Sequence, residues 1–356
     1  MLPYETIHIC NPDAMECQEY KEAGGETSRH LEGEMVSSRQ SIPSITTKQS
    51  GSSNMTSFKN IAVVGGAGNL GPAIVKALLD ADFNVTALSR EGSTSTFPSG
   101  VTVKKVNYDS SDSVTAALEG QDALVSVIAS PAIKNQIALV DAAIAAGVKR
   151  IIPSEFGINT RVANGAIAKI LSAKVQTVDY LMEKAKSVPG FTWTGLANSL
   201  FFDWGLTRGT VGFNAATKTA TIYDSGNEPV SGTNLAYIGK GVAGILKHPE
   251  ETANKYLCIA SFTTTQNEIL ASIEKETGEK WKVEHVKTAD LQKSGEEKLA
   301  QGHPMAFPDL VRAWSFADGC GHAFKPGENA AGMLGLEKES LEETLRVWMK
   351  EKGLIA

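Results

Sequence analysis

The sequence predicts an α/β protein built on a doubly wound parallel sheet, with a smaller mixed α/β lobe in its second half. Short apolar runs alternate with amphipathic segments from Lys59 to about Gly205, and a glycine-rich turn joins the first run to the first amphipathic segment. The 356-residue chain is 42% hydrophobic and 21% charged. This composition can bury a sizeable core and excludes wholesale disorder.

The runs that predict buried strands carry few polar residues and end in turn residues. In chain order they are NIAVVG, NVTALSR, VTVKKV, DALVSVIAS and RIIPSEFG. The segment LGPAIVKALLDA repeats its apolar residues at helical spacing, and IKNQIALVDAAIAAGVK predicts a helix that ends at Gly147. Strands that alternate with helices in this way are typical of a parallel sheet.

After about Gly205 the alternation changes. The segment TKTATIYDSGNEPVS predicts a β-hairpin, KYLCIAS and WKVEHV predict two further strands, and LEKESLEETLRVWMKEKG predicts a terminal amphipathic helix. We therefore expect residues 56–205 to form the main sheet domain. Residues 206–356 are expected to form mainly the second lobe, partly interleaved with the sheet.

Residues 1–55 differ in composition from the rest of the chain. Residues 1–54 hold eight acidic and four basic side chains, so most of the net charge of −6 lies there. The stretch SSRQSIPSITTKQSGSSN has no apolar period and predicts a disordered tail. The first residues lack the features of a secretory signal, and their acidity argues against a mitochondrial presequence. Because Met55 directly precedes the first predicted strand, a start assigned too far upstream stays an open alternative.

Composition and charge also exclude several classes of function. The net charge of −6 argues against a nucleic-acid binder, which needs a basic stripe. No apolar run approaches the roughly 18 residues that span a bilayer. The four cysteines are too few and too scattered for a disulfide scaffold, and no cluster has metal-ligand spacing. We expect a cytoplasmic protein that binds a small molecule and does not bind a metal ion, a membrane or nucleic acid. Whether it forms a homodimer stays open.

A glycine motif follows the first predicted strand and opens the first predicted helix. It consists of Gly65, Gly66, Ala67, Gly68, Asn69, Leu70 and Gly71. In such a G-x-x-G-x-x-G turn the backbone can approach a pyrophosphate closely, and the helix N-terminus offers it free N–H groups. The context predicts a dinucleotide site in a Rossmann-type domain, and the alternative is a purely structural turn.

The end of the second predicted strand indicates which dinucleotide is bound. NAD-binding proteins place an acidic residue there to hold the ribose 2′-hydroxyl, whereas this chain has Ser89 and Arg90. A guanidinium group can bind a 2′-phosphate that a carboxylate would repel. We therefore predict NADPH as the cofactor, with a merely solvated Arg90 as the alternative.

Lys174 occupies an unusual position on the helix predicted from about Ile167 to Ala185. At 100° per residue, six apolar residues of this helix form one stripe, and Lys174 falls at about 340°, in the middle of it. Such a lysine either extends its amine to water or holds a functional amine. Burial disfavours the ammonium form and would lower the pKa toward a value useful for proton transfer.

A competing pair on the same helix is Tyr180 and Lys184, which have the Tyr-x-x-x-Lys spacing of classical short-chain dehydrogenases. Tyr180 falls at about 220°, across the helix from the apolar stripe. The same spacing arises by chance in lysine-rich helices, so we favour Lys174 over this pair.

The glycine motif, the segment AAIAAGVKRIIPSEFG and the lysine-bearing helix together resemble the NmrA-like, atypical short-chain dehydrogenase/reductase family. Within it the chain is most similar to isoflavone reductases, phenylcoumaran benzylic ether reductases and their fungal relatives, over about residues 58–350. The resemblance implies a Rossmann fold, NADPH and a single catalytic lysine, which falls on Lys174. It further implies that Arg90 meets the 2′-phosphate and that other residues line the nicotinamide or its groove, namely Asn198, Ser199, Phe201, Ser130, Pro153 and Phe156.

The chain departs from the plant pattern in the loop from Ile158 to Ala166, which puts plant phenylpropanoid substrates in doubt. We predict an NADPH-dependent reductase that delivers hydride to a carbonyl, an activated double bond or a benzylic carbon of a small aromatic or conjugated secondary metabolite. The alternatives are a non-catalytic NADP-sensing regulator and a dehydrogenase or epimerase. His303 and His322 flank an aromatic segment that either covers the substrate or simply packs.

Overall fold

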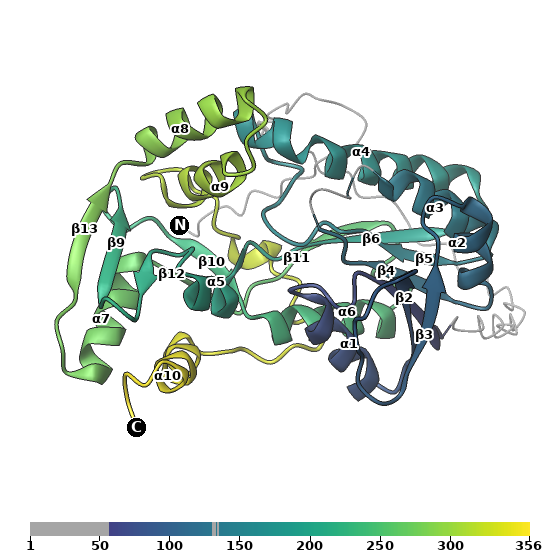
Figure 1. Ribbon diagram of the computed structural model, residues 1–356, viewed down its shortest axis with the longest axis horizontal. Coiled ribbons are helices and arrows are strands. Elements are labelled where there is room, and N and C mark those ends of the chain that lie inside the picture. The colour runs from purple at the N-terminus through teal and green to yellow at the C-terminus, as the bar shows by residue number, and fades with distance from the viewer. Residues whose placement is uncertain (1–56, 130–132, 134) are drawn as a thin grey trace, which may run out of the picture. The chain divides into compact units, whose positions relative to one another are not determined.

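A seven-stranded parallel sheet organises the protein (Figure 1). The structure is a computed structural model that describes residues 57–129, 133 and 135–356. The expected tail, residues 1–55, and Ser130 therefore lie outside the described residues. The strands of the large sheet are β1 (Asn60–Val64), β2 (Asn84–Arg90), β3 (Val101–Val106), β4 (Ala123–Ser126), β5 (Arg150–Ile152), β6 (Thr192–Ala197) and β11 (Lys255–Cys258).

The strand order is β11-β6-β5-β4-β1-β2-β3, so the chain winds outward from β1 in both directions. Ile61 of β1 pairs with Val85 on one side and with Ala123 on the other, both in parallel. This is the doubly wound, Rossmann-type sheet that the sequence predicts. Because every pairing in the sheet is parallel, the carboxyl ends of its strands share one edge, where ligands bind in folds of this type.

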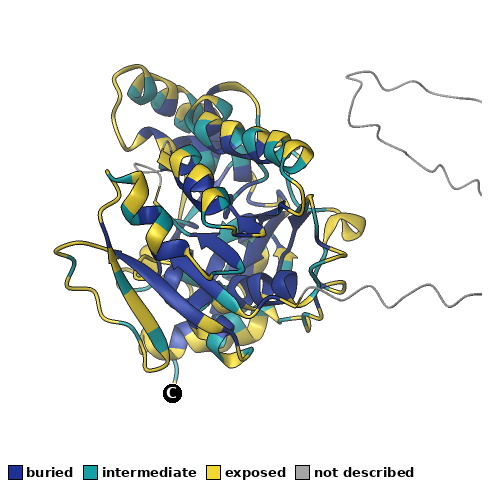
Figure 2. Cartoon of the chain, turned by 90° about the vertical axis from the view of Figure 1, so that its right-hand side faces the viewer, coloured by how far each residue is buried: buried dark blue, intermediate teal, exposed yellow. Residues whose placement is uncertain are grey.

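Helices cover both faces of the sheet. One face carries α1 (Gly71–Asp80) and α6 (Leu235–Lys247), and the other carries α2 (Ser111–Leu118), α3 (Gln136–Ala145) and α4 (Gly165–Ser187). The alternation along β1 shows the division: Ile61 and Val63 pack in the first core, and Ala62 and Val64 in the second. Burying a Val, Ile or Leu side chain stabilises the fold by about 1.5–3 kcal/mol. Figure 2 shows the strands of this sheet as largely buried.

The rest of the chain forms two small sheets and their helices. One sheet has the order β12 (Phe262–Thr264), β10 (Val230–Thr233), β7 (Leu200–Phe201), and the other β13 (Lys282–Val286), β9 (Thr219–Tyr223), β8 (Phe213–Asn214). The accompanying helices are α5 (Phe202–Arg208), α7 (Gln266–Thr277), α8 (Thr288–Ala300), α9 (Ala306–Phe316) and α10 (Leu341–Glu351). Within the described residues, no helix has the length and apolar run needed to cross a membrane.

The predicted hairpin at 217–231 is wrong. β9 pairs in parallel with β13 and antiparallel with β8, whereas β10 pairs with β12 and β7. The turn between β9 and β10 is instead held by the start of α8, because the Asp224 carboxylate accepts a hydrogen bond from the Thr288 amide at 2.8 Å. The predicted strand KYLCIAS also has an unexpected partner: as β11 it joins the large sheet beside β6.

Candidate active site

The carboxyl edge of the large sheet gathers most of the residues that the sequence singles out. The glycine motif follows β1, Ser89 and Arg90 end β2, Pro153 and Phe156 follow β5, and Asn198 and Ser199 follow β6. The strand order reverses between β1 and β4, so the crevice of this fold type opens there.

The glycines of the motif are required by the turn itself. Gly65 has φ +82°. A Cβ there would lie 2.4 Å from the carbonyl oxygen of Val127, the residue directly after β4. A Cβ at Gly71 would lie 2.4 Å from the backbone of Gly66. The first βα turn therefore closes only with glycine at both positions.

The start of α1 is open to an anion. The residue before the helix, Leu70, has no side chain that caps it, and Pro72 in the first turn carries no N–H group. Next to this turn lies a hollow of about 310 Å³. Its walls are Gly66, Ala67, Pro72, Val75, Ser95, Thr96, Phe97 and Pro98. An uncapped helix N-terminus of this kind can bind a phosphate group, and the hollow lies directly beside it.

Arg90 is exposed at the end of β2, so its guanidinium group is accessible to a ligand, whereas Ser89 is buried. The neighbouring Tyr108 donates a hydrogen bond to the Leu88 carbonyl at 3.0 Å. Burial raises the pKa of Tyr108 to about 12, and the positive charge of Arg90 opposes that rise.

Lys174 is buried, with 8% of its surface exposed, as its place in the apolar stripe predicts. Its amine donates a hydrogen bond to the Phe156 carbonyl at 3.1 Å. Gly157 has φ +138°, and a Cβ there would come within 3.9 Å of the amine. Burial lowers the pKa of Lys174, and the charge of Glu155 opposes this effect. The result is a desolvated amine held against the turn that follows β5.

Asn198 and Ser199 shape that same turn. Asn198 is fully buried, and its side-chain oxygen accepts a hydrogen bond from the Gly157 amide at 3.0 Å. In return the Gly157 carbonyl accepts hydrogen bonds from the amides of Asn198 and Ser199, at 3.0 and 2.9 Å. Ser199 has φ +54°, a left-handed conformation that is uncommon for serine. Phe201 packs edge-on against Trp204, with ring centroids 6.5 Å apart.

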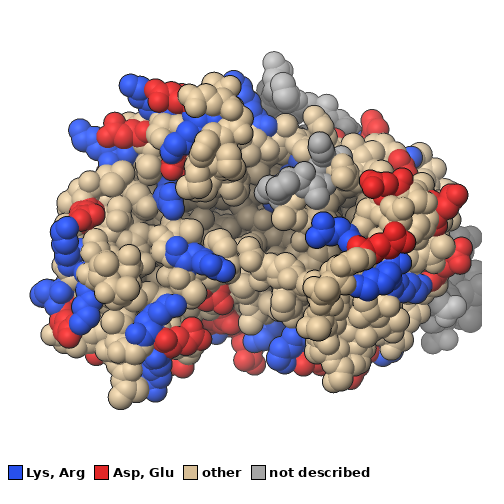
Figure 3. Space-filling view, viewed as in Figure 1, with Lys and Arg blue, Asp and Glu red and all other residues tan. Residues whose placement is uncertain are grey.

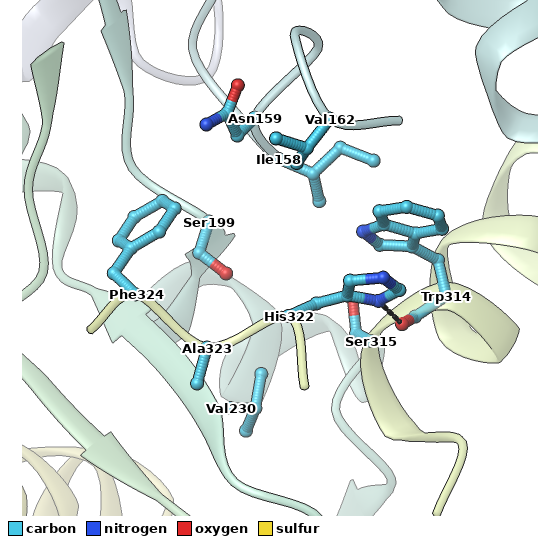
Figure 4. A pocket seen from close by; sticks show the side chains of 10 residues that line it. All are labelled: Ile158, Asn159, Val162, Ser199, Val230, Trp314, Ser315, His322, Ala323 and Phe324. Carbon is cyan, nitrogen blue, oxygen red and sulfur yellow. Dashed lines mark hydrogen bonds between the residues drawn. The ribbon is translucent and has the colours of Figure 1, made fainter. Parts of the chain in front are cut away.

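A small pocket lies next to Ser199 (Figure 4). Its other walls are Ile158, Asn159, Val162, Val230, Trp314, Ser315, His322, Ala323 and Phe324. Its volume of about 20 Å³ is room for a single water, so a larger ligand fits only if the walls move apart. Figure 3 shows a hollow in the middle of one face of the molecule, with a visible lining that is largely neither acidic nor basic.

His322 and Trp314 form one wall of this pocket. Their rings stack with centroids 3.5 Å apart and an angle of 8°. The Nδ1 atom of His322 lies 2.7 Å from the Trp314 carbonyl oxygen and donates to it, because a carbonyl can only accept. His303, by contrast, is exposed and accepts a hydrogen bond from the Met305 amide. Of the two predicted histidines, only His322 lines the pocket.

The loop that carries His322 is held by Glu228, which sequence reasoning missed. This buried carboxylate accepts hydrogen bonds from the amides of Gly319 and Gly321 at 2.6 and 2.8 Å. No local pattern in the sequence points to it, because the loop it holds lies more than 90 residues away.

The alternative pair, Tyr180 and Lys184, is directed toward α3. The Tyr180 hydroxyl donates to the Asp141 carboxylate at 2.6 Å, and the Lys184 amine lies 3.2 Å from the same carboxylate. Both side chains are therefore engaged at the surface of the α3–α4 contact. The described part of the chain also holds no group of three or more His, Cys, Asp or Glu side chains arranged for a metal ion.

Comparison with known proteins identifies the family. The family described as NmrA-like matches residues 57–305. The chain belongs to the NmrA-like family. Oxidoreductase poxI from Penicillium oxalicum is 36% identical over 284 residues, 78% of this chain and 90% of that protein. Isoflavone reductase homolog IRL from Zea mays is 31% identical over 278 residues, 68% of this chain and 84% of that protein.

A solved structure of the same fold is the binary complex of leucoanthocyanidin reductase with NADPH from Vitis vinifera. Its TM-score is 0.70 at 21% identity, and the match covers 82% of this chain and 99% of that chain. These likenesses confirm the predicted isoflavone reductase-like membership and the Rossmann-type fold. They group the chain with the oxidoreductases of the family.

Proposed function

We propose that this protein is an NADPH-dependent reductase of a small aromatic or conjugated compound, and that Lys174 is its general acid or base. The observation that carries the proposal is the buried amine of Lys174 at the carboxyl edge of the sheet. A buried lysine that forms no direct ion pair within the described residues is costly to a fold, so a chemical role accounts for its presence better than packing does.

The choice of NADPH rests on the glycine motif and on Arg90. The uncapped start of α1 and the hollow beside it suit a dinucleotide, and Arg90 is exposed where a 2′-phosphate would lie. The grapevine relative of the same fold was solved with NADPH. When bound, NADPH supplies hydride from its nicotinamide ring.

The Lys174 amine is suited to moving a proton at the reacting atom. Burial favours its neutral form, and the hydrogen bond to the Phe156 carbonyl fixes the direction of the side chain. The amine would protonate an alkoxide or enolate oxygen that forms during reduction, or remove a proton from a phenol to open a benzylic centre. Such general acid or base catalysis contributes about 10²–10⁴-fold to the rate.

The lining of the small pocket suits a flat, apolar substrate. Trp314, His322 and Phe324 offer ring faces, and Ile158 and Val162 add aliphatic surface (Figure 4). Ring stacking against such a wall orients an aromatic ligand through its face.

The test is NADPH oxidation measured with a panel of quinones, enones, isoflavonoids and aryl ketones. With any substrate that turns over, Lys174→Ala is expected to lower kcat by about 10²–10⁴-fold while the Kd for NADPH changes little. Retention of kcat in Lys174→Ala would contradict the proposed role of the amine.

Two variants serve as matched controls on the same helix. Tyr180→Phe and Lys184→Ala remove the contacts to Asp141 and should leave kcat nearly unchanged. If Tyr180→Phe is the crippling change instead, the classical tyrosine mechanism applies. Tight NADPH binding with no turnover across the whole panel would favour a cofactor-sensing regulator.

A further inference from the structure

A fully buried carboxylate lies in the same turn as the carbonyl that holds Lys174. Glu155 has no exposed surface. Its Oε2 atom accepts hydrogen bonds from the Tyr256 hydroxyl, at 2.8 Å, and from the Thr160 hydroxyl. Its Oε1 atom is buried and has no hydrogen-bond partner among the described residues. A buried carboxylate that lacks full hydrogen bonding is costly and calls for a compensating charge.

Lys174 reaches this turn from α4. Its amine donates to the carbonyl of Phe156, the residue directly after Glu155, so the buried ammonium group and the turn that carries the buried carboxylate are in contact. Glu155 is the charged group that raises the pKa of Lys174 against the effect of burial. Both groups are buried, so the charge of one acts on the other with little screening by solvent.

Other ionisable groups around the pair are engaged elsewhere. On α9, which packs on α4, Asp309 contacts Lys298 and lies 3.6 Å from Arg312. At the surface of α4, Arg161 binds Asp179 at 2.8 Å.

Two further groups lie on β11. Tyr256 donates to Glu155, and burial followed by the Glu155 charge raises the Tyr256 pKa well above its usual value. Burial likewise raises the pKa of Cys258 to about 12, so both side chains are uncharged near neutral pH.

We propose that Glu155 is the positioning residue that keeps Lys174 able to carry a proton near neutral pH, and that Tyr256 and Thr160 hold its carboxylate in place. The proposal rests on the role given to Lys174 above and deepens it. Without the carboxylate, burial would lower the pKa of the amine further, so a smaller fraction of it would carry a proton to donate. Glu155 acts through Lys174 and not on the substrate.

The interaction is tested first without any substrate, by a double-mutant cycle on thermal stability. Lys174→Met, Glu155→Gln and the double variant are melted at neutral pH in the full-length protein. We expect each single change to lower Tm, because it leaves the opposite charge buried alone, and the double variant to lose clearly less than the sum. Additive losses would overturn the proposal, since they would show that the two groups act independently.

The second test is the pH dependence of kcat with a substrate from the panel. The limb of the profile that disappears in Lys174→Ala reports the pKa of Lys174. Glu155→Gln should move this limb to lower pH by about one unit, because the ammonium form loses its opposite charge. Tyr256→Phe leaves the charge in place, so it should lower Tm without moving the limb.

These outcomes separate the two proposals. A kcat that is unchanged in Lys174→Ala contradicts the proposed function, whatever the melting cycle shows. A kcat that falls equally at every pH in Glu155→Gln, with the limb in place, indicates a structural role and overturns the inference alone. If Glu155→Gln does not fold, Glu155→Met replaces it, because it also removes the charge and needs no hydrogen-bond partner. A limb that stays in place in Glu155→Met also overturns the inference.

Discussion

Gly71→Ala should damage the cofactor site although alanine normally favours a helix. In a helix interior, Gly→Ala stabilises by up to about 1 kcal/mol. Here the new Cβ would lie 2.4 Å from the carbonyl carbon and oxygen of Gly66, and 2.5 Å from the Gly65 oxygen. Ordinary contacts begin at 3.4 Å, so the glycine loop and the start of α1 must separate by about 1 Å.

The size of the effect follows from that separation. Overpacking of this kind costs about 1–3 kcal/mol, which lowers Tm by several degrees in a chain of this length. A displacement of about 1 Å at a site that holds a ligand by backbone N–H groups can cost up to about 100-fold in function. We therefore expect the Kd for NADPH to rise by about 10- to 100-fold in Gly71→Ala.

The assay is NADPH fluorescence titration together with a thermal melt of the same protein. Gly332→Ala is the matched control, because a Cβ at Gly332 meets nothing within 4 Å and its φ is not positive. This control should keep both Tm and Kd. Wild-type affinity and Tm in Gly71→Ala would refute the argument that the turn requires glycine there.

Three further predictions concern single side chains. Arg90→Ala should raise the Kd for NADPH about tenfold or more and leave the Kd for NADH unchanged. Titrations with both cofactors measure this, and equal effects on the two would exclude contact between Arg90 and the 2′-phosphate. Arg150→Met should lower the free energy of unfolding by about 2–4 kcal/mol, because the buried guanidinium group donates hydrogen bonds to Thr192, Thr194 and Thr252. Urea melts measure this loss, and a loss below about 1 kcal/mol would contradict the prediction. His322→Ala should raise KM for an aromatic substrate by about tenfold with a smaller change in kcat, and an unchanged KM would show that the ring wall does not contact the substrate.

The local features of the sequence were sufficient to predict the first half of the fold. Helical phase depends on residues three and four apart, so the place of Lys174 in the apolar stripe follows from the sequence of α4, whereas the structure decides that its amine stays buried. The glycine motif is equally local, because the turn it makes closes between β1 and the helix that follows. Parallel strands joined by helices then require the carboxyl ends to meet at one edge.

Contacts between distant segments were decided only by the tertiary structure. β9 and β10 look like a hairpin because the turn residues between them are local, but their partners β13 and β12 come later in the chain. Glu155 meets Tyr256 across 101 residues, and Glu228 holds the loop that carries His322 from more than 90 residues away. The physical reason is that strand pairing and buried polar contacts depend on which surfaces are brought together by core packing. A sequence pattern records the periodicity of each element, whereas its partners depend on the whole folded chain.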